Sequence, residues 1–353
     1  MFFALADVPF TLKLSAGIAL LALAIDVARR LLLTRHSFKN KHVLITGGSQ
    51  GIGKALAARL LARGARVTLL ARTATTLQKA KAELTVGRAG SDGDVQYVCA
   101  SITDSAQLAS AVAEATKTFG EVDVLVACAG SANPGLFLHQ SADDYARAMD
   151  LNYVGTVRTI KAVVEPMVAR KRGHIIVVGS AMSVVGFMGY TSYAPAKHAL
   201  RGLTDCLRNE LVGFNVAVQI AYPPDTETPG FEHENLTKPV ETLKMVPVDI
   251  YSAASVAESM LRGAERGLYH LPAPDPGINL LVSSVAGVSP RGWPCCEALL
   301  SPVLVLVEAA VSVYFDAWGR TYAKRHEAEL KAKEQGYTDR TVQVGDGLAR
   351  VPG

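Results

Sequence analysis

Charged residues and cysteines are both scarce in this sequence of 353 residues. Asp, Glu, Lys and Arg make up 19% of the chain and hydrophobic residues make up 49%, a balance that excludes an intrinsically disordered chain. The five cysteines are an odd number without paired metal-ligand spacing, so we expect reduced thiols and no metal site. The net charge of +4 comes without a long basic run, and nucleic acid is therefore not an expected partner.

The N-terminal apolar run is short for a membrane span. The twelve residues from Leu14 to Ile25 carry no charge and would cover about 18 Å as a helix, whereas the apolar core of a bilayer is about 30 Å thick. Arg29 and Arg30 follow within one helical turn. We interpret residues 1–40 as an uncleaved anchor segment whose basic flank keeps the following chain in the cytosol. Both a spanning and a monotopic attachment fit this pattern.

A second apolar region, residues 273–322, precedes a charged segment at 323–353 that we expect to form a helix and a tail. The run at 298–315 contains a single charged residue. Two interpretations fit: a hairpin that enters the membrane, or two helices buried against the rest of the protein. Trp293 and Trp318 at the edges of the run favour the membrane.

Short runs of β-branched and other apolar residues alternate with helix-length segments in the middle of the chain. The predicted strands occupy residues 42–46, 66–70, 95–99, 122–127, 174–179 and 216–222. Their nearly continuous apolar character is typical of parallel strands that are covered on both faces. The alternation predicts an α/β fold over residues 41–272, a doubly wound parallel sheet of the Rossmann type. Its ligand crevice should lie at the carboxyl ends of the strands.

A glycine-rich loop directly follows the first predicted strand. The loop residues that we expect to bind a cofactor are Gly47, Ser49, Gln50, Gly51, Ile52 and Gly53. Glycines there allow a tight turn and close packing of a helix on a strand, and the amino end of the following helix offers free N–H groups to a pyrophosphate. The loop therefore predicts a dinucleotide cofactor.

The second predicted strand ends without an acidic residue. An enzyme that prefers NAD usually has an acid there, which holds the ribose hydroxyls. This strand is followed instead by Arg72, and a guanidinium group can pair with a 2′-phosphate. NADPH is therefore the predicted cofactor, with Arg72 as the ligand of its 2′-phosphate.

Three residues with complementary proton chemistry follow the fifth predicted strand. Ser180 lies at the end of that strand, and Tyr193 and Lys197 stand four residues apart at the start of a helix, so that both project from one face. Reduction of a ketone needs a hydride at carbon and a proton at oxygen. An ammonium group beside Tyr193 should lower its pKa from about 10 toward neutral. Ser180 can donate a hydrogen bond to the substrate oxygen, and we predict that all three residues are catalytic.

Together these motifs resemble the short-chain dehydrogenase/reductase family over residues 41 to about 270. The resemblance rests on the glycine-rich loop, on Ser180 followed by YAPAK at 193–197, and on LNYVG at 151–155. It implies the Rossmann fold and an oxidoreductase that uses a nicotinamide cofactor.

The same resemblance implies roles for three further residues. Asn152 would hold a water that links Lys197 to solvent, Gly130 would line the cofactor crevice, and Thr228 would contact the nicotinamide amide. The family has Asn-Asn-Ala-Gly or Asn-Cys-Ala-Gly where this chain has Ala-Cys-Ala-Gly ending at Gly130, so we expect a side-chain bridge between neighbouring strands to be missing. Ser101 replaces the acid that the family places near the adenine.

The stretch AYPPDTETPGF at 221–231 resembles a narrower family, the 3-ketodihydrosphingosine reductases of the endoplasmic reticulum. That resemblance implies NADPH-dependent reduction of 3-ketosphinganine (3-dehydrosphinganine) to sphinganine in sphingolipid synthesis, with the proton supplied by Tyr193. The long-chain sphingoid ketone and membrane lipid would be its partners. The catalytic domain would face the cytosol from the endoplasmic reticulum membrane, and the family pattern is compatible with a homodimer.

Two other functions stay open at this point. Another membrane-bound reductase of the same family, acting on steroid, retinoid or 3-ketoacyl substrates, would use the same Ser180, Tyr193 and Lys197. A catalytically silent NADPH-binding scaffold would need only the glycine-rich loop. The presence of all three proton-transfer residues argues against the scaffold.

Overall fold

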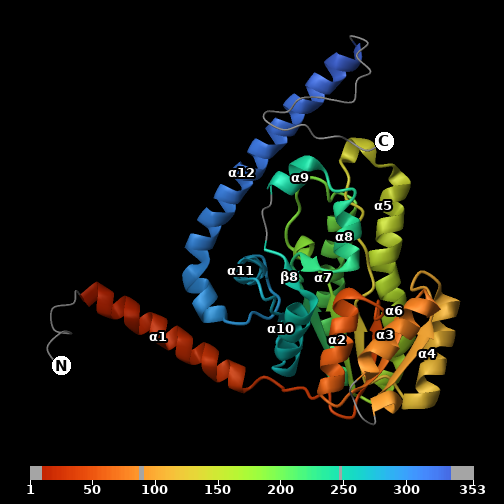
Figure 1. Cartoon of the computed structure of the whole chain (residues 1–353). Coiled ribbons are helices and arrows are strands. Elements are labelled where there is room, and N and C mark those ends of the chain that lie inside the picture. Colours follow the sequence, from red (N-terminus) through yellow and green to blue (C-terminus); the bar gives the residue numbers. More distant parts are fainter. Residues whose placement is uncertain (1–9, 87–90, 246–248, 335–353) are drawn as a thin grey trace.

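A seven-stranded parallel sheet forms the centre of the protein in this computed structural model, which describes residues 10–86, 91–245 and 249–334 (Figure 1). The strand order is β3-β2-β1-β4-β5-β6-β9. The chain proceeds outward from β1 in one direction and from β4 in the other, so the topological switch point lies between β1 and β4. The strands of this sheet are β1 (His42–Thr46), β2 (Arg66–Ala71), β3 (Val95–Cys99), β4 (Val124–Ala127), β5 (Gly173–Val178), β6 (Val216–Ala221) and β9 (His270–Leu271).

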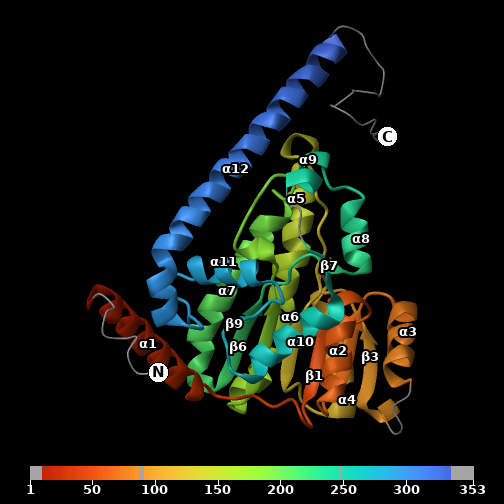
Figure 2. The same ribbon diagram turned by 60° about the vertical axis from the view of Figure 1, so that its left-hand side comes forward.

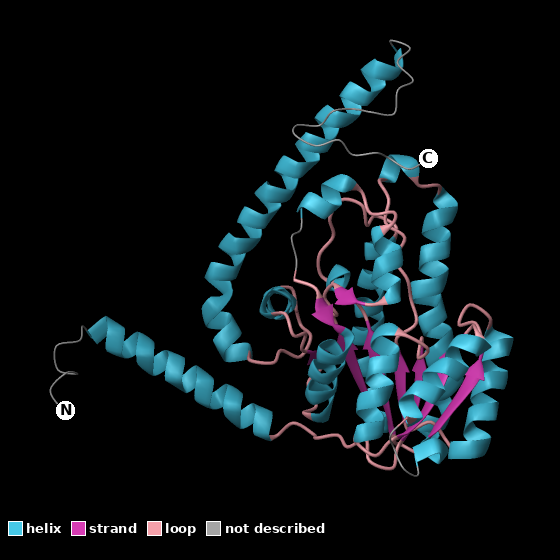
Figure 3. Ribbon diagram, viewed as in Figure 1, coloured by secondary structure: helices cyan, strands magenta, loops and turns pink. Residues whose placement is uncertain are grey.

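Helices cover both faces of the sheet (Figure 3). One face packs against α2 (Gly51–Ala62), α3 (Ala74–Thr85) and α10 (Ala253–Glu265). The other packs against α4 (Ser105–Phe119), α6 (Gly155–Ala169) and α7 (Tyr193–Leu211). The remaining elements are α1 (Phe10–Leu31), α5 (Ala142–Met149), α8 (Pro229–Asn235), α9 (Val240–Met245), α11 (Pro276–Ser284), α12 (Pro294–Glu334) and the short pair β7 (Thr226–Glu227) and β8 (Tyr251–Ser252).

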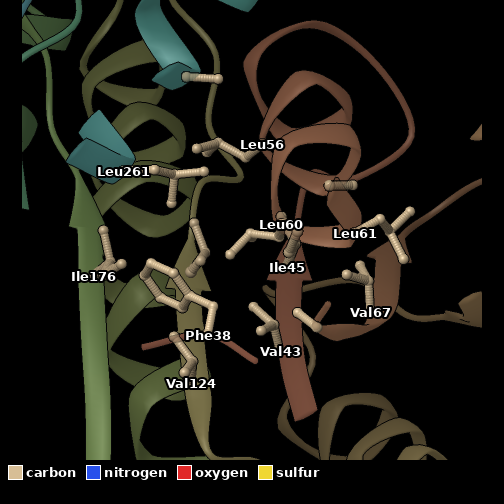
Figure 4. Close-up of a cluster of buried hydrophobic side chains, with 14 of the residues drawn as sticks. Phe38, Val43, Ile45, Leu56, Leu60, Leu61, Val67, Val124, Ile176 and Leu261 are labelled. Carbon is tan, nitrogen blue, oxygen red and sulfur yellow. The ribbon is translucent and has the colours of Figure 1, made fainter. Parts of the chain in front are cut away.

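Successive residues of each central strand point to opposite faces of the sheet. Val43 and Ile45 of β1 pack with Leu60 of α2 and Leu261 of α10 (Figure 4), whereas Leu44 joins the cluster on the other face. All five residues of β1 are buried. This burial on both faces explains the continuous apolar runs in the sequence, because neither face of the strand meets water.

The predicted doubly wound parallel sheet is confirmed, and the six predicted strands coincide with β1 to β6 to within two residues at each end. The sequence missed β9, which closes the sheet beside β6. It contains only two residues, His270 and Leu271, and a strand of that length leaves no periodic pattern in a sequence.

The two halves of the C-terminal apolar region behave differently. Helix α11 is packed against the domain, where Val282 shares a buried cluster with Tyr222 and Tyr269. Helix α12 is exposed along most of its length, and among the described residues it is the one helix long and apolar enough to cross a membrane, over Pro294–Ala332. It runs without a break through the boundary expected between residues 322 and 323. Residues 1–9 of the expected anchor and 335–353 of the expected tail lie outside the described residues.

Helices α1 and α12 meet at the start of α12 (Figure 2). The carboxylate of Asp26 in α1 accepts hydrogen bonds from the backbone N–H groups of Cys295 at 3.1 Å and Cys296 at 2.9 Å. The guanidinium of Arg30 lies 3.6 Å from the centre of the Trp293 ring. A capping carboxylate at a helix N-terminus is stabilising, so two apolar segments at opposite ends of the chain are joined by specific polar contacts.

Candidate active site

A crevice with a volume of about 400 Å³ lies at the carboxyl ends of the strands, at the switch point. All predicted site residues except Asn152 line it. They are Gly47, Ser49, Gln50, Gly51, Ile52, Gly53, Arg72, Gly130, Ser180, Tyr193, Lys197 and Thr228. The fold thus brings together residues that are up to 181 positions apart in the chain, Gly47 to Thr228.

The glycine-rich loop has the backbone geometry that its sequence predicts. Gly47 and Gly51 have positive φ angles of 68° and 54°, a conformation that costs other residues free energy. A Cβ atom on Gly53 would lie 2.3 Å from the carbonyl oxygen of Gly47, so only glycine fits there. No side chain caps the start of α2 at Gln50. The first N–H groups of this helix therefore face the crevice as an anion-binding site suited to a pyrophosphate.

A side-chain bridge ties β1 to the chain after β4. The Thr46 hydroxyl oxygen accepts hydrogen bonds from the backbone N–H groups of Cys128 and Ala129, each at 3.1 Å. This bridge comes from β1 and is distinct from the one expected to be missing, which the family's first asparagine would make and for which Ala127 has no polar side chain. Thr46 is a polar residue at the end of an otherwise apolar strand, and that position is the signal that would have found it.

Tyr193, Ser180 and Lys197 converge on one part of the crevice. Tyr193 is the first residue of α7, and the Lys197 Nζ lies one turn further on, 5.6 Å from the centre of the Tyr193 ring. Tyr193 and Ser180 share a side-chain hydrogen bond. The Lys197 ammonium donates to the carbonyl oxygen of Val178 at the end of β5, at 3.1 Å. The arrangement presents a phenol, a hydroxyl and an ammonium group to the same space.

The electrostatics of this group differ from the expectation in one respect. Burial raises the pKa of Tyr193, the carboxylates of Glu234 and Asp225 raise it further, and the hydrogen bond with Ser180 opposes them. The predicted lowering of this pKa by Lys197 is therefore wrong for the protein alone: removal from water outweighs the neighbouring cation. Burial also lowers the pKa of Lys197 to about 8. A raised pKa keeps the Tyr193 phenol protonated, which is the state that can donate to a ketone.

Asn152 lies behind the crevice and is 1% exposed. It belongs to a π-helical turn, Asp150–Val154, between α5 and α6, and such turns are frequent at functional sites. Its amide donates to the carbonyl oxygens of Ser131 and Ala148, both at 3.0 Å, and accepts from the Ser131 N–H at 3.1 Å. A Cβ atom on Gly130 would lie 2.6 Å from Asn152 Oδ1 and 3.4 Å from Lys197 Nζ. Asn152 therefore fixes the loop that borders the ammonium group.

Arg72 and Thr228 border opposite parts of the cofactor crevice. Arg72 is exposed directly after β2 and makes no ion pair with any described residue. Thr228 caps α8, where its hydroxyl accepts the N–H of Phe231 at 3.1 Å, and its methyl group lies 3.0 Å from where a Cβ on Gly51 would be. The Arg72 guanidinium is therefore available to an anion, and Thr228 packs over the glycine-rich loop.

Tyr190, Asp225 and Glu234 also line the crevice, although none of them was predicted as a site residue. Asp225 lies within the stretch 221–231 that the sequence singled out, but Glu234 lies beyond it on α8. A single acidic residue on a short helix has no distinctive pattern, so only the tertiary structure reveals it.

The sequence is similar to a known family and to known reductases. The family described as short chain dehydrogenase matches residues 41–239. The 3-dehydrosphinganine reductase of Danio rerio is 42% identical over 204 residues, which cover 57% of this chain and 61% of that protein, less than two thirds of its length. The 3-ketodihydrosphingosine reductase of Bos taurus is 38% identical over 254 residues, covering 70% of this chain and 75% of that protein.

A solved structure shows the same fold with a nicotinamide cofactor. The structure of a 3-oxoacyl-[acyl-carrier protein] reductase with bound NAD from Brucella melitensis aligns with a TM-score of 0.55 at 26% identity, over 66% of this chain and 87% of that one. The family match spans more than half of the sequence and includes the glycine-rich loop, Ser180, Tyr193 and Lys197. The chain belongs to the short chain dehydrogenase family of oxidoreductases.

Proposed function

We propose that this protein is an NADPH-dependent 3-ketosphinganine reductase that forms sphinganine. The observation that carries the proposal is the convergence of Ser180, Tyr193 and Lys197 beside a dinucleotide crevice, in a chain whose relatives are named for this reaction. The crevice fits the cofactor: its glycines leave room for a pyrophosphate, the start of α2 offers N–H groups, and Arg72 offers a cation.

NADPH, when bound, supplies the hydride that reaches the ketone carbon. The Tyr193 phenol donates its proton to the ketone oxygen as negative charge develops there, and Ser180 donates a hydrogen bond to the same oxygen. The Lys197 ammonium stabilises the tyrosinate left behind. The tyrosinate regains a proton from the Lys197 ammonium, and we assign Asn152 to the relay that then returns a proton from solvent to Lys197. We assign Gly130 and Thr228 to the walls of the nicotinamide site.

The choice of NADPH over NADH rests on Arg72. Replacing Arg72 with Ala is expected to raise the KM for NADPH roughly tenfold or more and to change the KM for NADH less than twofold, because only NADPH carries the 2′-phosphate that pairs with the guanidinium group. Steady-state kinetics with both cofactors check this expectation. An equal change for the two cofactors would contradict the assignment of Arg72.

Membrane attachment of both terminal regions belongs to the same proposal. Helix α12 is long and apolar enough to cross a bilayer, and α1 exposes apolar side chains such as Leu20 and Leu21 beside it. We assign residues 1–40 and 273–322 to the membrane, 41–272 to a catalytic domain on the cytosolic side of the endoplasmic reticulum, and 323–353 to a charged end. A substrate with a long alkyl chain partitions into that membrane, so attachment shortens its route to the crevice.

A homodimer completes the proposed organisation. Helices α6 and α7 carry an apolar groove of about 490 Å³ that includes Val164, Leu203 and Leu207. The groove lies on the sheet face away from α10, so a second copy that covers it leaves the crevice accessible.

Cofactor oxidation by membranes that contain the protein tests the proposed function. Given NADPH and 3-ketosphinganine, these membranes are expected to consume NADPH and form sphinganine, at a rate well above that with steroid ketones, retinal or 3-ketoacyl thioesters. The product is identified by mass spectrometry. Preferred turnover of one of the other substrates would favour the second candidate, another membrane-bound reductase of the family.

A further inference from the structure

Beside Tyr193, the wall of the crevice is formed in part by a group of charged and polar side chains that the mechanism above does not use. It consists of Tyr190, Asp225, Glu234 and Lys238. The Lys238 ammonium is 3.3 Å from Glu234 Oε1 and 3.9 Å from Asp225 Oδ2, and its side chain is 6% exposed. The Tyr190 hydroxyl donates to the same Glu234 Oε1. Lys238 therefore lies behind the carboxylates rather than in the crevice.

One oxygen of Glu234 is left for a ligand. Both of these contacts fall on Oε1, and no hydrogen bond or ion pair joins Oε2 to another described residue. The Glu234 side chain is 16% exposed and lines the crevice. Two carboxylates, Asp225 and Glu234, share one ammonium group, so a negative charge remains uncompensated at this wall. A largely buried carboxylate gains most from a cation that can also donate a hydrogen bond.

Glu234 lies within electrostatic reach of the proton donor. The ring of Tyr190, whose hydroxyl binds Glu234, has its centre 6.2 Å from the centre of the Tyr193 ring. Among the charged groups that shift the pKa of Tyr193, the Glu234 carboxylate has the largest effect and raises that pKa. A ketone held at Tyr193 therefore places the substituents of its neighbouring carbon close to Glu234.

We propose that Glu234 binds an ammonium group on the carbon next to the substrate ketone and so makes the crevice selective for 2-amino ketones. This inference rests on the proposed function, because 3-ketosphinganine carries its amino group on that carbon. Tyr190 and Lys238 are positioning residues that hold Oε1 and leave Oε2 to the substrate. Reductases of steroids, retinoids or 3-ketoacyl thioesters have no use for such a carboxylate, since those substrates carry no cation beside the ketone.

The test compares two ketones that differ only in the amino group: 3-ketosphinganine and 1-hydroxyoctadecan-3-one. Glu234→Gln is isosteric and keeps an oxygen for Tyr190. It is expected to lower kcat/KM for 3-ketosphinganine roughly ten- to hundredfold, the effect of losing a charge-assisted hydrogen bond. For the uncharged ketone, kcat/KM is expected to change less than threefold. Glu232→Gln, an exposed position on the same helix, is the matched control and should leave both values unchanged.

The outcomes separate this inference from the proposed function. If the wild type reduces 3-ketosphinganine, the proposed function stands. The role of Glu234 is then overturned if Glu234→Gln lowers kcat/KM equally for both ketones, or lowers it for neither. A wild-type protein that reduces neither ketone overturns both. Thermal unfolding and NADPH binding of each variant show that the fold is intact, so a selective loss on the amino ketone supports the proposal.

Discussion

Tyr193→Phe is expected to lower kcat for ketone reduction by roughly 1,000-fold, because the ring keeps its place while the hydroxyl group that transfers its proton to the ketone oxygen is removed. The Kd for NADPH is expected to stay within about threefold, since the glycine-rich loop and Arg72 do not depend on the phenol. Stopped-flow measurement of NADPH oxidation and fluorescence titration of the cofactor give the two values.

Tyr97→Phe provides the control for this change. Tyr97 lies on β3, outside the crevice, and packs against the core, and its hydroxyl makes no hydrogen bond to another described residue. It should retain full activity. Turnover by Tyr193→Phe within tenfold of the wild type would show that another group supplies the proton.

Lys197→Met is expected to lower kcat roughly 100-fold or more and to stabilise the protein at neutral pH. Burial lowers the pKa of Lys197 from 10.5 to about 8, so the folded protein holds its ammonium form at a cost below pH 8. Between about pH 8 and 10.5 the unfolded chain binds more protons than the folded one, and the stability of the wild type therefore rises with pH in that window. The variant lacks this rise.

We expect Lys197→Met to be more stable than the wild type by about 2 kcal/mol at pH 7, after allowing about 1 kcal/mol for the lost hydrogen bond to Val178. The difference should narrow at pH 9.5. Urea unfolding of the cofactor-free protein at both pH values measures it, with Lys117→Met on the exposed face of α4 as the control. A variant that is less stable than the wild type at pH 7, or a difference that does not change with pH, would contradict the pKa of Lys197.

The substitutions of Tyr193 and Lys197 affect a site whose functional side chains lower the stability of the folded protein. A buried ammonium group and a buried phenol are each unfavourable in a packed domain. Their partners are few: Val178 for Lys197 and Ser180 for Tyr193. Sites where local rules of stability are broken in this way are the expected places for chemistry.

The central sheet and the dinucleotide loop followed from local patterns in the sequence. Parallel strands buried on both faces have continuous apolar runs, such as 42–46 and 174–179, and these runs can be recognised from the sequence alone. The loop at 47–53 is equally local, because its glycines are needed by the turn itself. Tyr193 and Lys197 were found for the same reason: four residues along one helix always share a face.

The features that could not be predicted from the sequence depend on contacts between segments that are distant in the chain. The Thr46 bridge joins residues 82 and 83 positions apart, and the polar contacts of Asp26 with Cys295 and Cys296 join opposite ends of the chain. The direction of the Tyr193 pKa depends on its burial and on Glu234, which no local pattern placed beside it.

The sequence by itself determined which residues could carry out hydride and proton transfer, because propensity, burial pattern and spacing are local properties of the chain. The tertiary structure decided the rest: that α12 is one continuous exposed helix while α11 is packed, and that Glu234, held at Oε1 by Tyr190 and Lys238, lines the crevice beside Tyr193. The physical reason is that desolvation and charge act through space, and the folded chain alone sets those distances.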